Sequence, residues 1–109
     1  MDEHEFQTKC GEAFEGLRKR LLELGDEHGF EVEGGSGKLE VEFEEPEEAR
    51  FVISPNSPVR QIWISALTTS FKLGWSDQAG GFVLDKTGET LNQVMSRILT
   101  QQLGSPVSV

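Results

Sequence analysis

Hydrophobic and polar residues follow two different periods along this chain, and each period predicts a different kind of element. Near both ends the apolar residues recur every three or four positions, which is the period of an amphipathic helix. This pattern predicts helices over residues 3–24 and 91–103, with Gly25 as the stop of the first. Thr90 and Gln93 fit a capping box at the start of the second helix.

Between the two helices the pattern changes to alternation of apolar and polar residues, as in a strand with one buried face. Two alternating runs flank the turn Gly34-Gly35-Ser36-Gly37, which predicts a β-hairpin. Further runs, separated by acidic, Pro-containing and Gly-containing turns, predict four more strands. The six predicted strands cover residues 30–33, 39–43, 50–54, 61–66, 70–76 and 82–85.

Two helices that each carry one apolar stripe must cover an apolar surface, and a sheet with one apolar face provides it. We therefore predict an α+β fold: a two-layer α-β sandwich whose antiparallel sheet of about six strands has both helices on one face. At 109 residues the chain has the size of a single domain, residues 1–109, ending in a short C-terminal tail at 104–109. The other face of the sheet is predicted to stay open.

Strand alternation selects the side chains of this open face. In the fourth strand Ile62 and Ile64 are expected to point toward the helices. Gln61 and Trp63 then point to solvent, and Lys72 of the fifth strand lies on the same side. An exposed tryptophan forgoes the ~1.5–3 kcal/mol typical of burying a large apolar side chain, and Trp is a frequent binding hot spot. Trp63 is therefore either a partner-binding residue or an indole packed under a neighbouring side chain.

Charge is distributed unevenly along the chain. There are 19 acidic and 10 basic residues, and residues 1–50 alone carry 16 of the acids against 6 bases. The first fifty residues therefore have a net charge of -10, whereas residues 51–109 have +1. This excess argues against nucleic acid binding, because phosphates demand Lys and Arg. It favours cations, a basic protein partner or simple solubility.

Acidic residues gather at the end of the first predicted helix and on the hairpin. They are Glu23, Asp26, Glu27, Glu31, Glu33, Glu40 and Glu42. This group is either a solvated face or a set of oxygen ligands for a hard cation such as Mg²⁺, Ca²⁺, Mn²⁺ or ferrous iron. Three carboxylates at ~4 Å from a divalent ion contribute at most ~6 kcal/mol in water, a Kd of about tens of micromolar. We therefore expect weak, exchangeable sites.

Other chemistry is sparse. The single cysteine, Cys10, excludes an internal disulfide and lies on the apolar helix stripe, so we expect a buried, inert thiol. Together with Cys10, His4 and His28 provide too few ligands for a tight zinc site. No apolar run approaches the ~20 residues of a membrane helix, and the first residues do not read as an export leader. We expect neither membrane insertion nor secretion.

Two segments carry a resemblance to a known family. Residues 58–65 read Pro-Val-Arg-Gln-Ile-Trp-Ile-Ser, which is similar to the frataxin signature Pro-x-x-Gln-Ile/Val-Trp-Leu/Ile-Ser/Ala. Residues 85–91 read Asp-Lys-Thr-Gly-Glu-Thr-Leu and resemble the segment that leads into the last helix of that family. From about Glu5 to Gly104 the chain resembles a bacterial-type frataxin. The resemblance implies the α-β sandwich that the residues already predict.

The resemblance also implies a function: an iron-binding protein of iron–sulfur cluster assembly that regulates a cysteine desulfurase–scaffold complex and donates iron. It implies weak binding of Fe²⁺ or Fe³⁺ on an acidic ridge, whose matching residues are Glu23, Asp26, Glu27, Glu31 and Glu33. The ridge is implied to dock on a basic patch of the desulfurase, and the open sheet to contact the scaffold. The implied partner-binding residues are Gln61, Trp63, Lys72, Glu40 and Glu42.

Some positions depart from the family pattern, and alternatives stay open. Leu22 and Gly25 stand at ridge positions that are often acidic in the family, so the helical side of the ridge is thinner. An enzymatic alternative is a ferroxidase with iron storage, although no paired Glu/His helical ligand set is present. A further alternative is an acidic interaction domain without an iron role. We expect a monomer in the bacterial cytoplasm, or in the mitochondrial matrix if the chain is a trimmed eukaryotic one.

Overall fold

The computed structural model describes residues 1–35 and 37–109. The helices are α1 (Glu3–His28) and α2 (Leu91–Leu103), and a 3-10 turn forms η1 (Ser57–Val59). The strands are β1 (Glu31–Gly35), β2 (Lys38–Phe43), β3 (Ala49–Asn56), β4 (Gln61–Ala66), β5 (Thr69–Ser76) and β6 (Gly81–Leu84). In the described part of the chain, neither helix is long and apolar enough to span a membrane.

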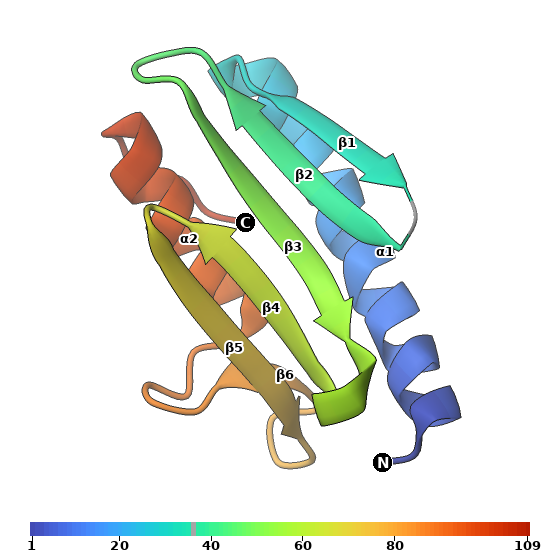
Figure 1. Cartoon of the computed structure of the whole chain (residues 1–109). Coiled ribbons are helices and arrows are strands. Elements are labelled where there is room, and N and C mark those ends of the chain that lie inside the picture. Colours follow the sequence, from blue (N-terminus) through green and yellow to red (C-terminus); the bar gives the residue numbers. More distant parts are fainter. Residues whose placement is uncertain (36) are drawn as a thin grey trace.

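The six strands form one antiparallel sheet in the order β1-β2-β3-β4-β5-β6, so each strand pairs with its neighbours in sequence. Figure 1 shows both helices behind one face of this sheet, while the other face is uncovered. The predicted α+β two-layer sandwich, with terminal helices on one face, is therefore confirmed. Strand boundaries differ from the predicted ones by one or two residues at most. In the predicted turn 34–37, Ser36 lies outside the described residues.

The apolar core lies between the two layers, where the helix stripes meet the apolar face of the sheet. Strand alternation produces this face, as in β4, where Ile62 and Ile64 are buried and Ser65 is exposed. The largest fully buried side chains are Phe6, Leu21, Leu24, Phe43, Phe51, Ile53, Ile62, Ile64, Leu73, Met95, Ile98 and Leu99. Each contributes roughly 1.5–3 kcal/mol through burial, which makes this core the main source of stability.

The first helix is one turn longer than predicted. The sequence predicts a stop at Gly25, but α1 continues to His28 and ends at Gly29, whose φ of 82° is the left-handed conformation of a C-cap. Gly25 is instead buried within the helix, where an added Cβ would lie only 2.6 Å from the carbonyl oxygen of Phe30. The glycine at this position is therefore required for the close return of the chain, and the prediction of a stop was wrong.

The last residues fold back onto the two helices. Val107 is buried, and its backbone N–H donates to the hydroxyl of Thr100 at 3.0 Å. Arg20 of α1 donates from Nη2 to the carbonyl oxygen of Ser108 at 2.8 Å. The segment after α2 thus connects both helices and contributes to the core.

Candidate functional site on the open sheet face

The open face of the sheet is organised into rows of side chains that run across the strands. Residues that pair across neighbouring strands lie on the same face and contact each other. Three of these rows are Glu31–Glu42–Arg50, Glu33–Glu40–Val52 and Ser54–Trp63–Lys72. The face therefore changes from carboxylates over β1 and β2 to an indole and an ammonium group over β4 and β5.

Three carboxylates converge on the β1–β2 hairpin. One oxygen from each of Glu31, Glu33 and Glu42 lies within 4.8 Å of the other two, and we call this group the hairpin carboxylate cluster. The register produces it, because Glu31 stands opposite Glu42 and Glu33 is two positions further along the same face. Glu31 and Glu33 are exposed, and Glu42 is half-buried. Such a group offers hard oxygen ligands at the spacing that a single cation can bridge.

Two basic side chains lie beside this cluster, and one of them, Arg50, pairs with a member of it. Arg50 Nη2 is 3.5 Å from Oε1 of Glu42, and Arg50 Nη1 is 3.8 Å from Oε1 of Glu40. Lys38 Nζ is 3.9 Å from the same Glu40 oxygen. The Arg50 side chain is 61% exposed, so each of these pairs contributes at most about 1 kcal/mol. Glu40 is therefore ion-paired on two sides, whereas the cluster itself keeps most of its negative charge.

Arg50 was not among the sequence-predicted site residues. Its alternation with Phe51 places it on the open face, and this signal was available in the sequence. Its partner Glu42 depends on the register across the β2–β3 turn, which alternation alone does not fix. Glu44 and Glu48 of that turn were also missed, and they line a groove of about 650 Å³ together with Glu42 and Arg50.

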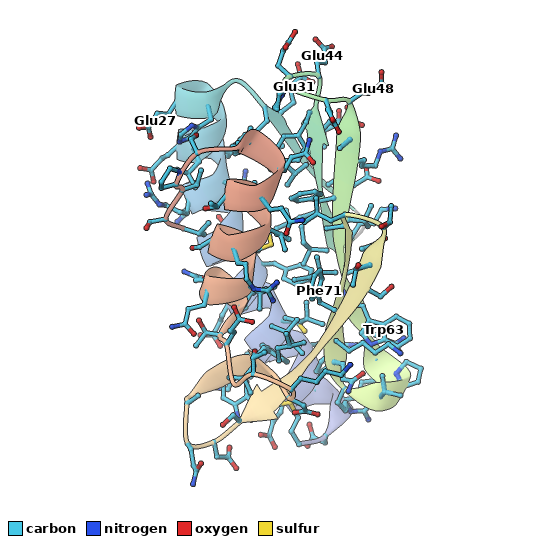
Figure 2. The ribbon with its side chains drawn as sticks, turned by 90° about the vertical axis from the view of Figure 1, so that its left-hand side faces the viewer. Glu27, Glu31, Glu44, Glu48, Trp63 and Phe71 are labelled. Carbon is cyan, nitrogen blue, oxygen red and sulfur yellow. The ribbon has the colours of Figure 1, made fainter. Side chains whose placement is uncertain are left out.

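The helical acids expected in the same ridge do not join the cluster. Glu23, Asp26 and Glu27 are exposed on α1, in the layer that covers the opposite face of the sheet. Figure 2 shows Glu27 on the helical layer and Glu31 on the sheet layer at the same end of the molecule. Glu23 Oε2 is 3.8 Å from Nη1 of Arg20. The expected ridge is therefore divided between two surfaces that meet at one end.

Trp63 lies on the open face, as the alternation predicts, and it packs against its neighbours there. Figure 2 shows it projecting from the sheet on the side away from the helices. Its Nε1 donates to Oε1 of Gln61 at 2.9 Å, and Lys72 Nζ lies 4.8 Å from the ring centre. A cation at this distance from an indole contributes about 0.5–1 kcal/mol at an exposed site. The indole is half-buried by these two side chains and keeps a surface toward solvent.

Cys10 is 5% exposed in the core, and burial raises the pKa of its thiol to about 11. The thiol is therefore protonated at neutral pH, and the predicted burial of this cysteine is confirmed.

Fold and site together define a class: a small α-β sandwich with an acidic hairpin and an open sheet face that carries a tryptophan. The chain belongs to the frataxin-like domain family, whose match covers residues 1–105. This family membership confirms the resemblance drawn from residues 58–65 and 85–91.

Several curated bacterial proteins are similar to nearly the whole chain. The iron–sulfur cluster assembly protein CyaY of Azotobacter vinelandii is 24% identical over 100 residues, which is 90% of this chain and 89% of that protein. The protein of the same name from Pseudomonas putida is 28% identical over 100 residues, with the same shares covered. Among solved structures, a frataxin from Psychromonas ingrahamii shares the fold with a TM-score of 0.77 at 19% identity, covering 99% of this chain and 97% of that one.

Proposed function

We propose that this chain is an iron–sulfur cluster assembly protein that carries iron as weakly bound cargo and regulates a cysteine desulfurase–scaffold complex. Its place in the frataxin-like domain family and the names of its bacterial relatives support the assembly role. The observation that carries the iron-binding part is the convergence of Glu31, Glu33 and Glu42 on the open face. In this proposal the chain acts as one domain, as a monomer, in the bacterial cytoplasm.

The chemistry of the hairpin carboxylate cluster suits weak and exchangeable iron. Its three oxygen ligands match Fe²⁺ and Fe³⁺. In solvent, three carboxylates contribute at most ~6 kcal/mol to binding of a divalent ion, which corresponds to a Kd of about tens of micromolar. The guanidinium of Arg50, 3.5 Å from Glu42, opposes a cation there and weakens binding further. Weak binding is an advantage for a donor, because the cargo leaves quickly on contact with an acceptor.

The exposed helical acids have a different role in this proposal. Glu23, Asp26 and Glu27 lie outside the cluster, so they do not share its ion. Their exposed negative charge accelerates the approach of a basic surface on the desulfurase and loses its effect at high salt. Glu40 lies on the open sheet face instead, where its pairs with Lys38 and Arg50 can exchange for pairs with the partner.

Trp63 supplies the short-range contact with the assembly complex. An indole that is half-buried in the free protein and flanked by Gln61 and Lys72 has the features of a hot spot, namely large apolar area and little conformational freedom to lose. Docking on this face brings the hairpin carboxylate cluster to the border of the complex, because both lie on the same side of the sheet. The proposed iron site and the Trp63 contact thus lie on the same face of the sheet.

Two double variants, each of which removes two negative charges, test the iron site. The double variant Glu31→Gln/Glu33→Gln removes two ligands of the cluster, and Glu23→Gln/Glu27→Gln removes the same charge from α1. An anaerobic titration with Fe²⁺, followed by calorimetry and by amide shifts in ¹⁵N-labelled protein, should show binding weakened by up to about 4 kcal/mol, close to a thousandfold, only for the first variant. Equal losses in both variants would contradict the placement of iron on the hairpin.

The regulatory role is tested separately. Turnover of a bacterial cysteine desulfurase with its scaffold is measured with and without this chain, at low and high salt. The chain should change turnover at low salt and have a smaller effect at high salt, and Trp63→Ala should weaken the effect at both. Unchanged turnover in every condition would overturn the regulatory proposal while leaving the iron titration valid.

A further inference from the structure

The outer edge of β5 is paired along only half of its length. Residues 73–76 pair with β6, and β6 is in turn bridged on its other side between Val83 and Thr90. Residues 69–72 pair with β4 on one side and, within residues 1–35 and 37–109, with no strand on the other. Figure 1 shows this first half of β5 at the border of the sheet. An unpaired edge presents backbone N–H and C=O groups to an added strand.

A groove follows this free edge. It has a volume of about 630 Å³ and is lined by residues 69–72 and 84–87, together with Gln61 of β4 and Arg97 of α2. Phe71 lines it with a half-buried ring, and Figure 2 shows this residue on the side of the sheet that faces α2. The guanidinium of Arg97 from α2 lies 5.4 Å from the centre of the Phe71 ring. The groove therefore combines a backbone edge with an aromatic surface.

The charges that line this groove favour an acidic occupant. Lys72 and Lys86 are exposed, and neither takes part in an ion pair within the described residues. Arg97 is already occupied, because Glu89 accepts two hydrogen bonds from it at 2.8 and 2.9 Å. Among the described residues that line the groove, Asp85 is the one acid, so Lys86 and Lys72, which contacts only the Trp63 ring, leave an excess of positive charge. This excess is local, since the whole chain has a net charge of -9.

We propose that the free edge of β5 binds an extended, acidic segment of a partner protein as an additional β-strand. Backbone hydrogen bonds to alternate residues of 69–72 hold the segment, and an apolar side chain of the segment contacts Phe71. Its carboxylates face Lys72 and Lys86. The four residues 69–72 without a second partner suit a segment of about four to six residues, the usual length of a short strand. This interaction does not require iron, and it goes beyond the function proposed above, although Lys72 also contacts Trp63.

The opposite edge of the sheet provides an internal contrast. β1 is also an edge strand, but it carries the exposed carboxylates of Glu31 and Glu33. An acidic segment is repelled there and attracted at β5, so charge decides between two edges of otherwise similar backbone chemistry.

The test uses the full chain and a synthetic probe. The probe is a capped peptide of about six alternating glutamate and valine residues, and its control has lysine in place of glutamate. In ¹⁵N-labelled protein we expect the acidic probe to shift the amides of residues 69–72 and 85–87 and to slow hydrogen exchange on alternate residues of 69–72. Absence of shifts there, or shifts on β1 instead, would overturn the proposal.

Variants of the chain test the charge contacts with the probe, and a modified probe tests its backbone hydrogen bonds. Lys86→Glu should raise the Kd of the acidic probe about tenfold, or about 1.4 kcal/mol, and Asp85→Asn should lower it. Lys19→Glu makes the same change of charge on α1, away from the groove, and should have little effect. Two further probes are N-methylated on alternate backbone amides, one on the odd and the other on the even positions. An added strand uses only one of these two sets of amides for hydrogen bonds to β5, so one of the two probes should no longer bind. Binding that survives both methylations would show that no strand is added. Equal effects of Lys19→Glu and Lys86→Glu would show that the groove is not the binding site.

Discussion

Glu31 and Glu42 stand directly opposite each other in the β1–β2 hairpin, so the sheet register forces two carboxylates of the same charge together. Their oxygens, and one from Glu33, lie within 4.8 Å of one another. Like charges that are opposite in an antiparallel pair destabilise it. Arg50 relieves Glu42 from one side only, at 3.5 Å. The hairpin therefore carries an electrostatic cost that a bound cation would remove.

Neutralising one member of this pair should stabilise the fold. We expect Glu31→Gln to raise the free energy of unfolding by about 0.5 kcal/mol at low salt, and by less at high salt because of screening. Urea unfolding at two salt concentrations measures the change. Glu12→Gln, an exposed acid on α1 that forms no ion pair within the described residues, is the matched control for net charge. An equal gain in both variants would attribute the effect to net charge alone and not to the hairpin.

Two glycines of α1 should respond to alanine in opposite directions. A Cβ at Gly25 would lie 2.6 Å from the carbonyl oxygen of Phe30, so Gly25→Ala should cost about 1–3 kcal/mol by forcing the chain apart. At Gly16 nothing lies within 4 Å, so Gly16→Ala should stabilise by about 0.5–1 kcal/mol through helix propensity. Urea unfolding of both variants measures the two changes. A neutral Gly25→Ala would show that α1 does not need close approach there.

The hydrophobic pattern was sufficient for the layers but not for the ends of elements. Ile62 and Ile64 alternate with polar residues so regularly that the buried face of β4 follows from periodicity alone. Gly25 misled the prediction because a glycine serves either as a helix stop or as a site of close contact, and only tertiary packing distinguishes the two. The local sequence does not show how close the backbone of Phe30 lies to α1.

In the candidate site, too, the sequence predicted which face of the sheet a residue lies on but not which residues it contacts. Alternation correctly put Glu31 and Glu33 on one face, and the hairpin put Glu42 beside them. The position of Arg50 required the register across the β2–β3 turn. The separation of the helical acids from the hairpin required the three-dimensional arrangement of α1 on the opposite face of the sheet. Faces are set by local periodicity, whereas contacts between elements are set by packing and register.

The β4–β5 turn holds two residues in a backbone conformation that lowers the stability of the fold. Its two central residues, Leu67 and Thr68, have φ angles of 53° and 61°, which is the conformation in which Asn and Gly are normally found. Leu67 packs against the core, but Thr68 is exposed and β-branched. Thr68→Gly should therefore stabilise the protein by about 0.5–1 kcal/mol, because the relief of left-handed strain exceeds the entropy cost of glycine. Thr69→Gly, in extended backbone, should destabilise, and urea unfolding that shows equal effects would argue against strain at Thr68.

The Glu89–Arg97 pair should make stability depend on acid pH. Hydrogen bonds from Arg97, and a further one from Thr87, hold the pKa of Glu89 below its ordinary value of 4.5. A depressed carboxyl pKa stabilises the fold above the unfolded value, and this stabilisation is lost as pH falls through the folded value. Arg97→Met should therefore cost about 1 kcal/mol at pH 7 and progressively less below pH 4.5.

Unfolding of the native chain and of Arg97→Met across this pH range measures the effect. The double variant Arg97→Met/Glu89→Gln completes a thermodynamic cycle, and its difference from Glu89→Gln should not vary with pH, because the titrating carboxylate is absent. Part of the cost of Arg97→Met comes from the contact of its guanidinium with the Phe71 ring, and this part persists at low pH. A cost that stays constant between pH 7 and pH 3 would mean that packing on Phe71, and not the ion pair with Glu89, accounts for the whole contribution of Arg97.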